Sequence, residues 1–586
     1  MNNFNKLYKN KSILSSKWIL KEIDERKALF ISQKNNLSIF LSKLLSLLEI
    51  DEEYISQFLN PNISDILPDP FILKDMKKAV ERTIIAIREK QKIGILADYD
   101  VDGSASTAIL YKFLIKFNLD IVIKIPERLT EGYGPNTRIL NEFSKEKVNL
   151  LFTLDCGTSA HNTFNNKKNS NIDVIVIDHH ISEHILPNIY SIINPNRYDE
   201  SNELKDLAAV GVTFFFLIAL RKKLREQGYF KNITEPNLVS FLDLVALGTF
   251  CDVVQLTTIN RYFVSKGLEL IKLRKSKPLT AIFDNSKIKS QPKSEDLGYI
   301  LGPQINAASR MGYSSLPHKL LISNNIGEID TISRKLILYN EKRKLIENQI
   351  YNQAKDQIKS DKNSKFILIY GENWHNGVLG IVASRILNEF NKPTIVISFE
   401  NNIGTGSARS ITAINLAKII IDSKNEGLLI SGGGHSMAAG LKIQKNKLDS
   451  FKKFLNELLK DFNNTLFEKK SFLNQKISLN EINNTLLTDL KKLEPFGQGN
   501  LEPQFIFTKI NIETIKIIKD KHILVFFKNE LNKSIQGIAF NSVNTIIGDY
   551  LLKFKKFNFE IAGYLKEDHY NTNGIQIIIK DLMLLK

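Results

Sequence analysis

The chain has 586 residues, and its 80 Lys and Arg against 63 Asp and Glu give a formal net charge of +17. At about 150 residues per domain, this length predicts several domains, and the content of 43% hydrophobic and 24% charged residues excludes an intrinsically disordered chain. The positive charge mildly favours a polyanionic partner such as nucleic acid.

Cysteine content and hydropathy limit where the protein works. Two cysteines, Cys156 and Cys251, cannot form a disulfide framework for so long a chain, so we expect a reducing, cytoplasmic location. The longest apolar run, residues 207–220, is shorter than the ~18 to 20 residues that span a bilayer. Residues 1–27 carry charges every few positions and contain no secretory core. We therefore expect no membrane association.

The first half of the chain changes its pattern near residue 71. Residues 1–70 alternate short amphipathic patterns with polar breaks, which predicts a helical N-terminal segment. Afterwards helical windows alternate with apolar runs at 93–96, 150–154 and 174–177. This alternation is typical of a parallel-sheet α/β domain, which we assign to residues 71–330. Ligands bind at the carboxyl ends of the strands in such sheets.

The second half contains three further predicted regions. Residues 332–359 have apolar residues at helical spacing and no Gly or Pro, which predicts a long connecting helix within 331–363. A smaller α/β domain with glycine-rich loops is predicted for 364–465. Residues 466–586 contain short β-like runs at a spacing that favours a small β-barrel or a β-sandwich. The expected fold class is therefore a multi-domain α/β protein with a C-terminal barrel.

Acidic and histidine residues follow each predicted strand of the first α/β domain. A single Asp at a strand end is more often a helix cap than a ligand. Several such places in one domain, with three carboxylates within the segment DYDVDG at 98–103, favour a functional centre instead. The residues concerned are Asp98, Asp100, Asp102, Asp155, Asp178, His179, His180 and Asp252.

Crowded carboxylates need a compensating cation, because they cannot all stay ionised side by side. No Lys or Arg occurs within the DYDVDG, DCG or DHH segments, so a metal is the better candidate. Oxygen ligands with one or two imidazoles favour Mn²⁺ or Mg²⁺ over zinc. The donors exceed the needs of one ion, and two ions ~3.5 to 4 Å apart would favour phosphoester hydrolysis. Glycoside hydrolysis also uses paired carboxylates but needs neither the histidines nor so many acids.

The ordered segments DYDVDG, LDCG, DHH and GTFCDVV resemble the DHH phosphoesterase superfamily. The later strings WHNGVLGIVASR, GTGSARS and SGGGHSMAAG resemble its DHHA1 companion domain. The strings IPERLTEGYGPN, LGPQINAASRMG and LEPFGQGNLEPQF narrow the resemblance to the RecJ family of single-stranded-DNA-specific exonucleases. This resemblance runs from about residue 70 to the carboxyl terminus, and it implies that the C-terminal barrel is an OB fold.

The resemblance implies an activity and a set of metal ligands. The activity is a 5′-to-3′ exonuclease that releases 5′-mononucleotides from single-stranded DNA in DNA repair and recombination. Asp178 would orient the histidines, and His180 would face the scissile phosphate. The alternatives are that Asp178 caps a turn and that His180 is structural. The implied ligands, for a pair of Mn²⁺ or Mg²⁺ ions, are Asp98, Asp100, Asp102, Asp155, His179 and Asp252.

Substrate contacts are expected from arginines and from the second α/β domain. By resemblance, Arg128, Arg310, Ser407 and Arg409 would bind the 5′ end or the adjacent backbone, since guanidinium groups match phosphate oxygens. The glycine run at 432–434 would form a nest of N–H groups for an anion, with a tight turn as the alternative. Gly433, Gly434 and His435 therefore complete the predicted substrate site.

Other residues are open to two interpretations. Arg261 is a candidate for contact with the DNA backbone, whereas Arg385 is expected to pack on a helix face and to pair with an acid. The Lys and Phe residues of 553–559 would either stack on bases or lie in the core. Gln255, Gln304 and Ser309 depart from the family pattern and would affect substrate affinity more than catalysis.

The expected partner is single-stranded DNA, with a helicase and a single-strand-binding protein as further partners, and the expected state is a monomer. Two alternatives stay open. One is a DHH-type phosphodiesterase of oligoribonucleotides or cyclic dinucleotides, which would not need so long a chain. The other is a non-catalytic single-strand-binding scaffold, which would not need the complete set of acids and histidines.

Overall fold

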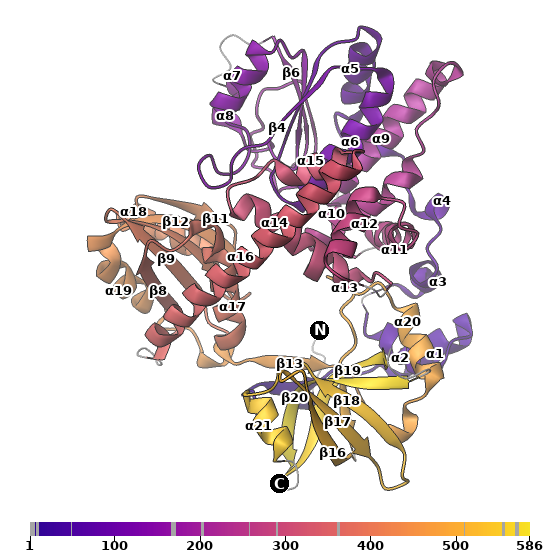
Figure 1. Cartoon of the computed structure of the whole chain (residues 1–586), viewed down its shortest axis with the longest axis vertical. Coiled ribbons are helices and arrows are strands. Elements are labelled where there is room, and N and C mark those ends of the chain that lie inside the picture. The colour runs from indigo at the N-terminus through magenta and orange to yellow at the C-terminus, as the bar shows by residue number, and fades with distance from the viewer. Residues whose placement is uncertain are drawn as a thin grey trace.

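The computed structural model describes residues 6–7, 11–48, 50–165, 171–200, 204–256, 258–288, 291–359, 364–508, 510–553, 557–568 and 574–585. Figure 1 shows the first α/β domain at the top, the second α/β domain at the left and the C-terminal sheet at the bottom. Within the described residues, no helix is long and apolar enough to cross a membrane.

The first α/β domain is built on a five-stranded parallel sheet in the order β4-β3-β5-β6-β7. The predicted strands are confirmed, and β3 and β5 are buried along their whole length because helices cover both faces of the sheet. The strands are β3 (Ile93–Ala97), β4 (Ile121–Lys124), β5 (Leu150–Leu154), β6 (Asp173–Ile177) and β7 (Ser191–Ile193).

Alternate strand residues face two separate helical layers. Ile95 packs in a large core with helices α5, α6, α9 and α10, whereas Leu96 packs with α7 and α8 on the other face. The helices of this domain include α5 (Met76–Arg88), α6 (Val101–Leu114), α7 (Thr137–Lys145), α8 (His161–Asn165), α9 (Ala209–Glu226), α10 (Leu242–Cys251), α11 (Thr258–Lys272), α12 (Lys277–Asn285), α14 (Gly302–Arg310) and α15 (Leu316–Ile322).

A single long helix, α16 (Ile326–Lys359), joins the two α/β domains. Its 34 residues extend about 50 Å, and it begins at Ile326 rather than at residue 331 as predicted. One end packs on α12 and α14, and the other packs on β8 and α17 of the second domain (Figure 1). The helix therefore determines how the two domains face each other.

The second α/β domain has a five-stranded mixed sheet in the order β11-β12-β10-β9-β8. Only β8 and β9 are parallel, and β11 lies at the edge of the sheet. Its elements are β8 (Ile367–Glu372), α17 (Leu379–Phe390), β9 (Thr394–Glu400), β10 (Ile403–Arg409), α18 (Leu416–Asn425), β11 (Ser431–Gly434), β12 (Ala438–Gln444) and α19 (Leu448–Leu459).

The C-terminal domain contains a seven-stranded mixed sheet in the order β14-β15-β19-β20-β18-β17-β16. In the described residues this sheet does not close, because β14 and β16 each pair with one neighbour only, which agrees with the partly open barrel of an OB fold. The elements are β14 (Gln475–Ser478), α20 (Asn484–Lys492), β15 (Phe505–Thr508), β16 (Asn511–Ile518), β17 (His522–Lys528), β18 (Ser534–Ala539), α21 (Ile546–Leu552), β19 (Asn558–Asp568) and β20 (Gly574–Leu585).

The N-terminal segment packs on this C-terminal domain (Figure 1). Besides helices α1 (Glu25–Asn35), α2 (Ile39–Ser46) and α3 (Ile55–Leu59), it contains strand β2 (Lys17–Leu20), which pairs in parallel with β13 (Lys470–Leu473). The purely helical prediction is therefore wrong for this segment. The two ends of the chain share one hydrophobic core, which sequence periodicity could not indicate.

Candidate metal centre and arginine cluster

Acidic residues follow three parallel strands directly and therefore lie at one edge of the first sheet. Strand β3 ends immediately before Asp98, β5 before Asp155, and β6 before Asp178. Asp252 follows helix α10, which packs against α6. Because the strands are parallel, their carboxyl ends meet at the same edge, as the sequence predicted.

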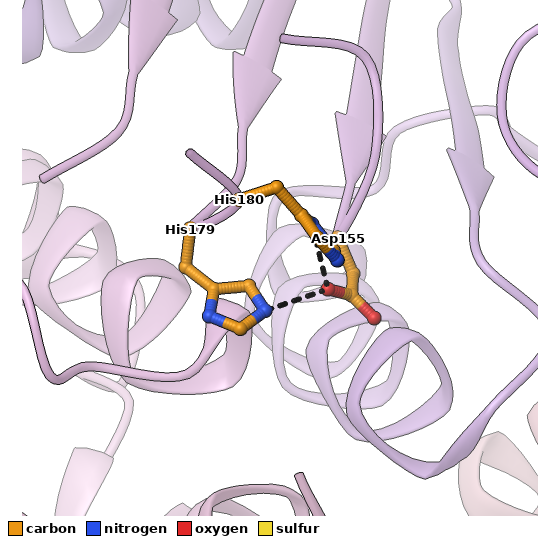
Figure 2. Close-up of side chains that lie close together, drawn as sticks. All are labelled: Asp155, His179 and His180. Carbon is orange, nitrogen blue, oxygen red and sulfur yellow. Dashed lines mark ion pairs between the residues drawn. The ribbon is translucent and has the colours of Figure 1, made fainter. Parts of the chain in front are cut away.

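The side chains at this edge lie within ligand distance of one another. Nε2 of His179 is 3.4 Å from Oδ1 of Asp155, and Nδ1 of His180 is 3.9 Å from the same oxygen (Figure 2). Nε2 of His179 also lies 3.5 Å from Oδ2 of Asp252. Three groups of donor atoms each lie within 4.8 Å, and neighbouring groups share Asp155 or His179. The groups are Asp155, His179 and His180; Asp102, His179 and Asp252; and Asp98, Asp100 and Asp155.

Buried oxygen and nitrogen atoms without a hydrogen-bond partner show that this cluster fits a cation. Oδ1 of Asp98, Oδ1 of Asp155 and Nε2 of His179 are buried and have no hydrogen-bond partner within the described residues. Buried polar atoms are normally hydrogen-bonded, so three orphans at one point indicate a missing partner. Hard oxygen donors with a neutral imidazole suit Mn²⁺ or Mg²⁺.

The pKa values of the same side chains also favour a bound cation. Burial, together with the neighbouring carboxylates, raises the pKa of Asp102 to about 7 and that of Asp252 to about 9. Burial likewise raises the pKa of Asp98 and of Asp155 well above the usual range. Burial lowers the pKa of His179 to about 4, so this imidazole is neutral and available as a ligand. A divalent cation would relieve the repulsion among the carboxylates.

Backbone N–H groups hold two of the carboxylates in place. Asp100 caps helix α6 by accepting a hydrogen bond of 3.1 Å from the Gly103 N–H. Asp102 accepts hydrogen bonds from Ala209 N–H at 2.6 Å and Val210 N–H at 2.9 Å, at the start of α9. A Cβ at Gly103 would lie 2.3 Å from the carbonyl oxygen of Asp98, so only glycine fits there. Asp100 thus caps a helix, and Asp102 lies at the start of another, while both also belong to the groups of possible metal donors.

Asp178 is fully buried and orients the second histidine. Its Oδ1 accepts hydrogen bonds from the backbone N–H groups of His179 and His180 and, at 2.8 Å, from Nδ1 of His180, while Oδ2 accepts one from the Thr158 N–H. Burial lowers the pKa of His180, but the hydrogen bond with Asp178 and the negative charges of Asp178, Asp252 and Asp98 together outweigh this effect and raise the pKa to about 9. The orienting role that we expected for Asp178 therefore applies to the ring of His180.

Tyr133 is a site residue that the sequence reasoning missed. Its hydroxyl donates to the carbonyl oxygen of Asp155 at 2.9 Å and lies 3.1 Å from Nδ1 of His180. The two rings meet edge to face with their centroids 5.6 Å apart. Its position between two glycines in the string IPERLTEGYGPN could have indicated a functional loop, but a single tyrosine does not by itself predict a role in a metal or phosphate site.

Three arginines from separate segments form a partly buried positive cluster, here called the arginine cluster: Arg128, Arg310 and Arg409. Burial and the neighbouring guanidinium groups lower the pKa of Arg310 to about 9, and burial and Arg128 lower that of Arg409. Arg310 donates to the carbonyl oxygen of Gly377 and Arg409 to that of Ala408 and to Oγ of Ser407, while Arg128 lies over the ring of Tyr99. Within the described residues, none of the three pairs with a carboxylate.

The glycine run adopts another conformation than we expected. Gly432, Gly433 and Gly434 belong to edge strand β11, which pairs with β12, so they do not form a nest. His435 follows in an exposed turn in which its N–H donates to the carbonyl oxygen of Ala438 at 2.8 Å. Neighbouring N–H groups point to opposite sides in a strand, so they cannot converge on one anion.

Arg261, a candidate for contact with the DNA backbone, has no donor left for such a contact. Its side chain is buried and its guanidinium group is used by backbone carbonyls of the N-terminal segment and the C-terminal domain. Arg385 packs on the ring of Tyr351 at 3.7 Å, as expected. Gln304 and Ser309 are buried in helix α14 and hydrogen-bonded there, to Ser286 and Asn306 respectively.

The aromatic residues of the C-terminal domain lie mainly in its core. Phe505, Phe527 and Phe559 are buried, and Phe557 packs against the ring of Tyr550. The core interpretation is therefore confirmed for these residues. The remaining part of the Lys and Phe stretch, residues 554–556, lies outside the described residues.

Comparison with known families matches three regions of the chain. The model of the DHH family, N-terminal domain, matches residues 92–249. The DHHA1 domain model matches residues 363–461, and the RecJ OB domain model matches residues 473–581.

Relatives and solved structures extend the similarity over most of the chain. The single-stranded-DNA-specific exonucleases RecJ of Escherichia coli and Salmonella typhimurium are 34% and 33% identical, each over 87% of this chain and 90% of the relative. The structure of RecJ in complex with Mn²⁺ from Thermus thermophilus has a TM-score of 0.79 at 24% identity, and the match covers 97% of this chain and 80% of that chain. A second structure, exonuclease RecJ bound to manganese, has a TM-score of 0.58 at 29% identity and covers 68% of this chain and 96% of that chain. This chain therefore belongs to the RecJ family.

Proposed function

We propose that the protein is a metal-dependent exonuclease that degrades single-stranded DNA from the 5′ end and releases 5′-mononucleotides, in DNA repair and recombination. The observation that carries this proposal is the occurrence of two complementary sites within the residues that the structure describes. One has buried acidic and histidine atoms without a hydrogen-bond partner, and the other has partly buried arginines without a carboxylate partner. The names of the RecJ relatives support single-stranded DNA as the substrate.

The carboxyl-terminal edge of the first sheet, with the acidic residues and histidines described above, is here called the acidic edge, and it would hold two divalent cations, Mn²⁺ or Mg²⁺. Their proposed ligands are Asp98, Asp100, Asp102, Asp155, His179 and Asp252. When bound, such ions lower the pKa of a coordinated water and polarise the phosphoryl oxygens. The Mn²⁺ and Mg²⁺ complexes of the RecJ structures support this choice of metals.

The remaining residues would orient the substrate. His180, whose Nδ1 is occupied by Asp178, has Nε2 left to donate a hydrogen bond to the scissile phosphate. Arg128, Arg310 and Arg409, with the hydroxyl of Ser407, would bind the phosphate at the 5′ end. Gly433 and Gly434 of edge strand β11, together with the exposed side chain of His435, would contact the DNA further along.

A single digestion of DNA labelled at either end tests the proposal. With Mn²⁺ or Mg²⁺, label at the 5′ end should be released first and as a mononucleotide, while label at the 3′ end stays in long fragments. Chelator should stop release of both labels. Release of the 3′ label first, or equal activity in chelator, would contradict the proposal, and preference for a cyclic dinucleotide would favour the compact phosphodiesterase class.

A further inference from the structure

We propose that the C-terminal domain positions the metal ligand Asp252 through a loop that docks beside it. This loop, residues 492–500, is called the docking loop. The inference rests on the metal centre proposed above and adds to it a positioning role for Arg261 and Gly497, which lie outside the acidic edge.

The docking loop packs directly on the residues that flank Asp252. The N–H of Leu256 donates to the carbonyl oxygen of Gln498 at 2.8 Å. A Cβ at Gly497 would lie 2.7 Å from Cδ1 of Leu256 and 3.2 Å from Cε2 of Phe250, so the loop backbone approaches both sides of Asp252 closely. Any displacement of the loop therefore removes support from residues 250–256.

Arg261 anchors the docking loop to the first α/β domain. It lies in the first turn of α11, is 1% exposed, and its guanidinium group lies 4.0 Å from the ring centroid of Phe58. Five hydrogen bonds from its side chain occupy its donors. The acceptors are the backbone carbonyl oxygens of Phe58, Lys492, Leu493, Glu494 and Pro495.

The neighbouring residue, Asn260, links the same helical turn to the metal centre. Its Nδ2 donates to the carbonyl oxygen of Gln255 at 2.8 Å and to that of Asp206 at 2.6 Å. Gln255 follows Asp252 closely, and Asp206 precedes the start of α9, where Asp102 accepts two backbone hydrogen bonds. Asn260 and Arg261 thus connect the metal-binding segment on one side with the docking loop on the other.

Backbone strain beside Asp252 makes such support necessary. Val253 has φ of 61°, a conformation that is unfavourable for a β-branched residue, and its side chain is 64% exposed, so it contributes little packing of its own. Strained conformations persist only where the surroundings hold them. The supporting contacts here are those of Leu256 and Gln255, which come from the docking loop and from Asn260.

Arg261→Lys and Gly497→Ala test this role. Lys keeps the charge but cannot reach five carbonyl groups, and the new methyl group at residue 497 separates the loop from Leu256 and Phe250. The control is Gly327→Ala at the start of α16, where a Cβ has only Oδ1 of Asn325 at 3.4 Å. Mn²⁺ binding to the full chain is measured by the electron paramagnetic resonance signal of free Mn²⁺, alongside kcat and KM for single-stranded DNA.

We expect both variants to bind Mn²⁺ about tenfold or more weakly, since changes that disturb metal ligands indirectly have effects of this size. Their kcat at limiting Mn²⁺ should fall and should recover at high Mn²⁺, while the control matches the unchanged protein. Unchanged Mn²⁺ affinity in folded Arg261→Lys or Gly497→Ala, with an effect on KM alone, would overturn the inference. Gly497→Ala leaves Arg261 in place and carries the test if Arg261→Lys does not fold. Absence of Mn²⁺ binding to the unchanged protein would instead overturn the proposed metal centre.

Discussion

The acidic edge and the arginine cluster differ in how the fold assembles them. Most of the carboxylates lie just after strands of one parallel sheet and Asp252 follows α10, and backbone N–H groups of the same domain hold Asp100, Asp102 and Asp178. The arginines come from a loop, from α14 and from β10 of the other domain, and two of them donate to carbonyl oxygens. The acidic edge is therefore local to one domain, whereas the arginine cluster exists only where α16 has brought two domains together.

The acidic edge and the arginine cluster carry charges of opposite sign, and in each region burial disfavours the charged form of the side chains. Burial raises the pKa of Asp102 and Asp252 and lowers that of Arg310 and Arg409, so each region disfavours its own charge. A phosphate bound to divalent cations carries both signs of charge. Substitutions in the acidic edge should therefore affect catalysis, and substitutions in the arginine cluster should affect phosphate binding.

The largest expected effect comes from the acidic edge. Asp155→Ala removes a donor that two of the three ligand groups share, so cleavage should fall by on the order of 10³-fold or more, because metal ions contribute several kcal/mol to such reactions. Binding to single-stranded DNA, measured by fluorescence anisotropy, should change little. Full cleavage in this variant would mean that the metal site lies elsewhere.

A smaller effect, on substrate binding, is expected from the arginine cluster. Arg409→Ala should raise KM for DNA with a 5′-phosphate by about 10 to 100-fold and leave kcat nearly unchanged. The change in KM corresponds to the loss of one or two charge-assisted hydrogen bonds. DNA with a 5′-hydroxyl should show little difference between the variant and the unchanged protein. Arg385→Ala in the same domain is the control, and equal losses on both substrates would argue against recognition of the terminal phosphate.

The smallest expected effect is on stability as a function of pH. In the metal-free protein the pKa of Asp102 is about 7 and that of Asp252 about 9, both above the ordinary value of 3.8. The folded state then binds these protons more tightly than the unfolded state, so their contribution is present at low pH and is lost as pH rises towards 9. Tm should decline between pH 5 and 9 in the metal-free protein, as calorimetry would measure.

Two controls sharpen this pH prediction. Saturating Mn²⁺ replaces the protons and should remove most of the decline, and Asp252→Asn should make it shallower. A Tm that is independent of pH in the metal-free protein, or that declines equally with and without Mn²⁺, would show that the carboxylates do not govern it.

Local sequence patterns were sufficient to predict the acidic edge, but they did not predict all of the residues around it. The strands at 93–97, 150–154 and 173–177 could be predicted because apolar runs form buried strands, and parallel strands bring their ends together. Tyr133 was missed because its hydroxyl reaches Asp155 and His180 only through the tertiary fold. The glycine nest was wrong because pairing with β12 decides the conformation of residues 432–434.

The sequence by itself determined the order of the domains, the chemical nature of the acidic edge and the resemblance to the DHH superfamily, since these depend on residue types at short spacing. Only the tertiary structure decided that the two ends of the chain share one core, that Arg261 holds a loop rather than DNA, and that Asp252 lies beside that loop. Residues 261 and 492–495 are far apart in the chain, and no local propensity encodes which backbone carbonyl groups a buried guanidinium will meet.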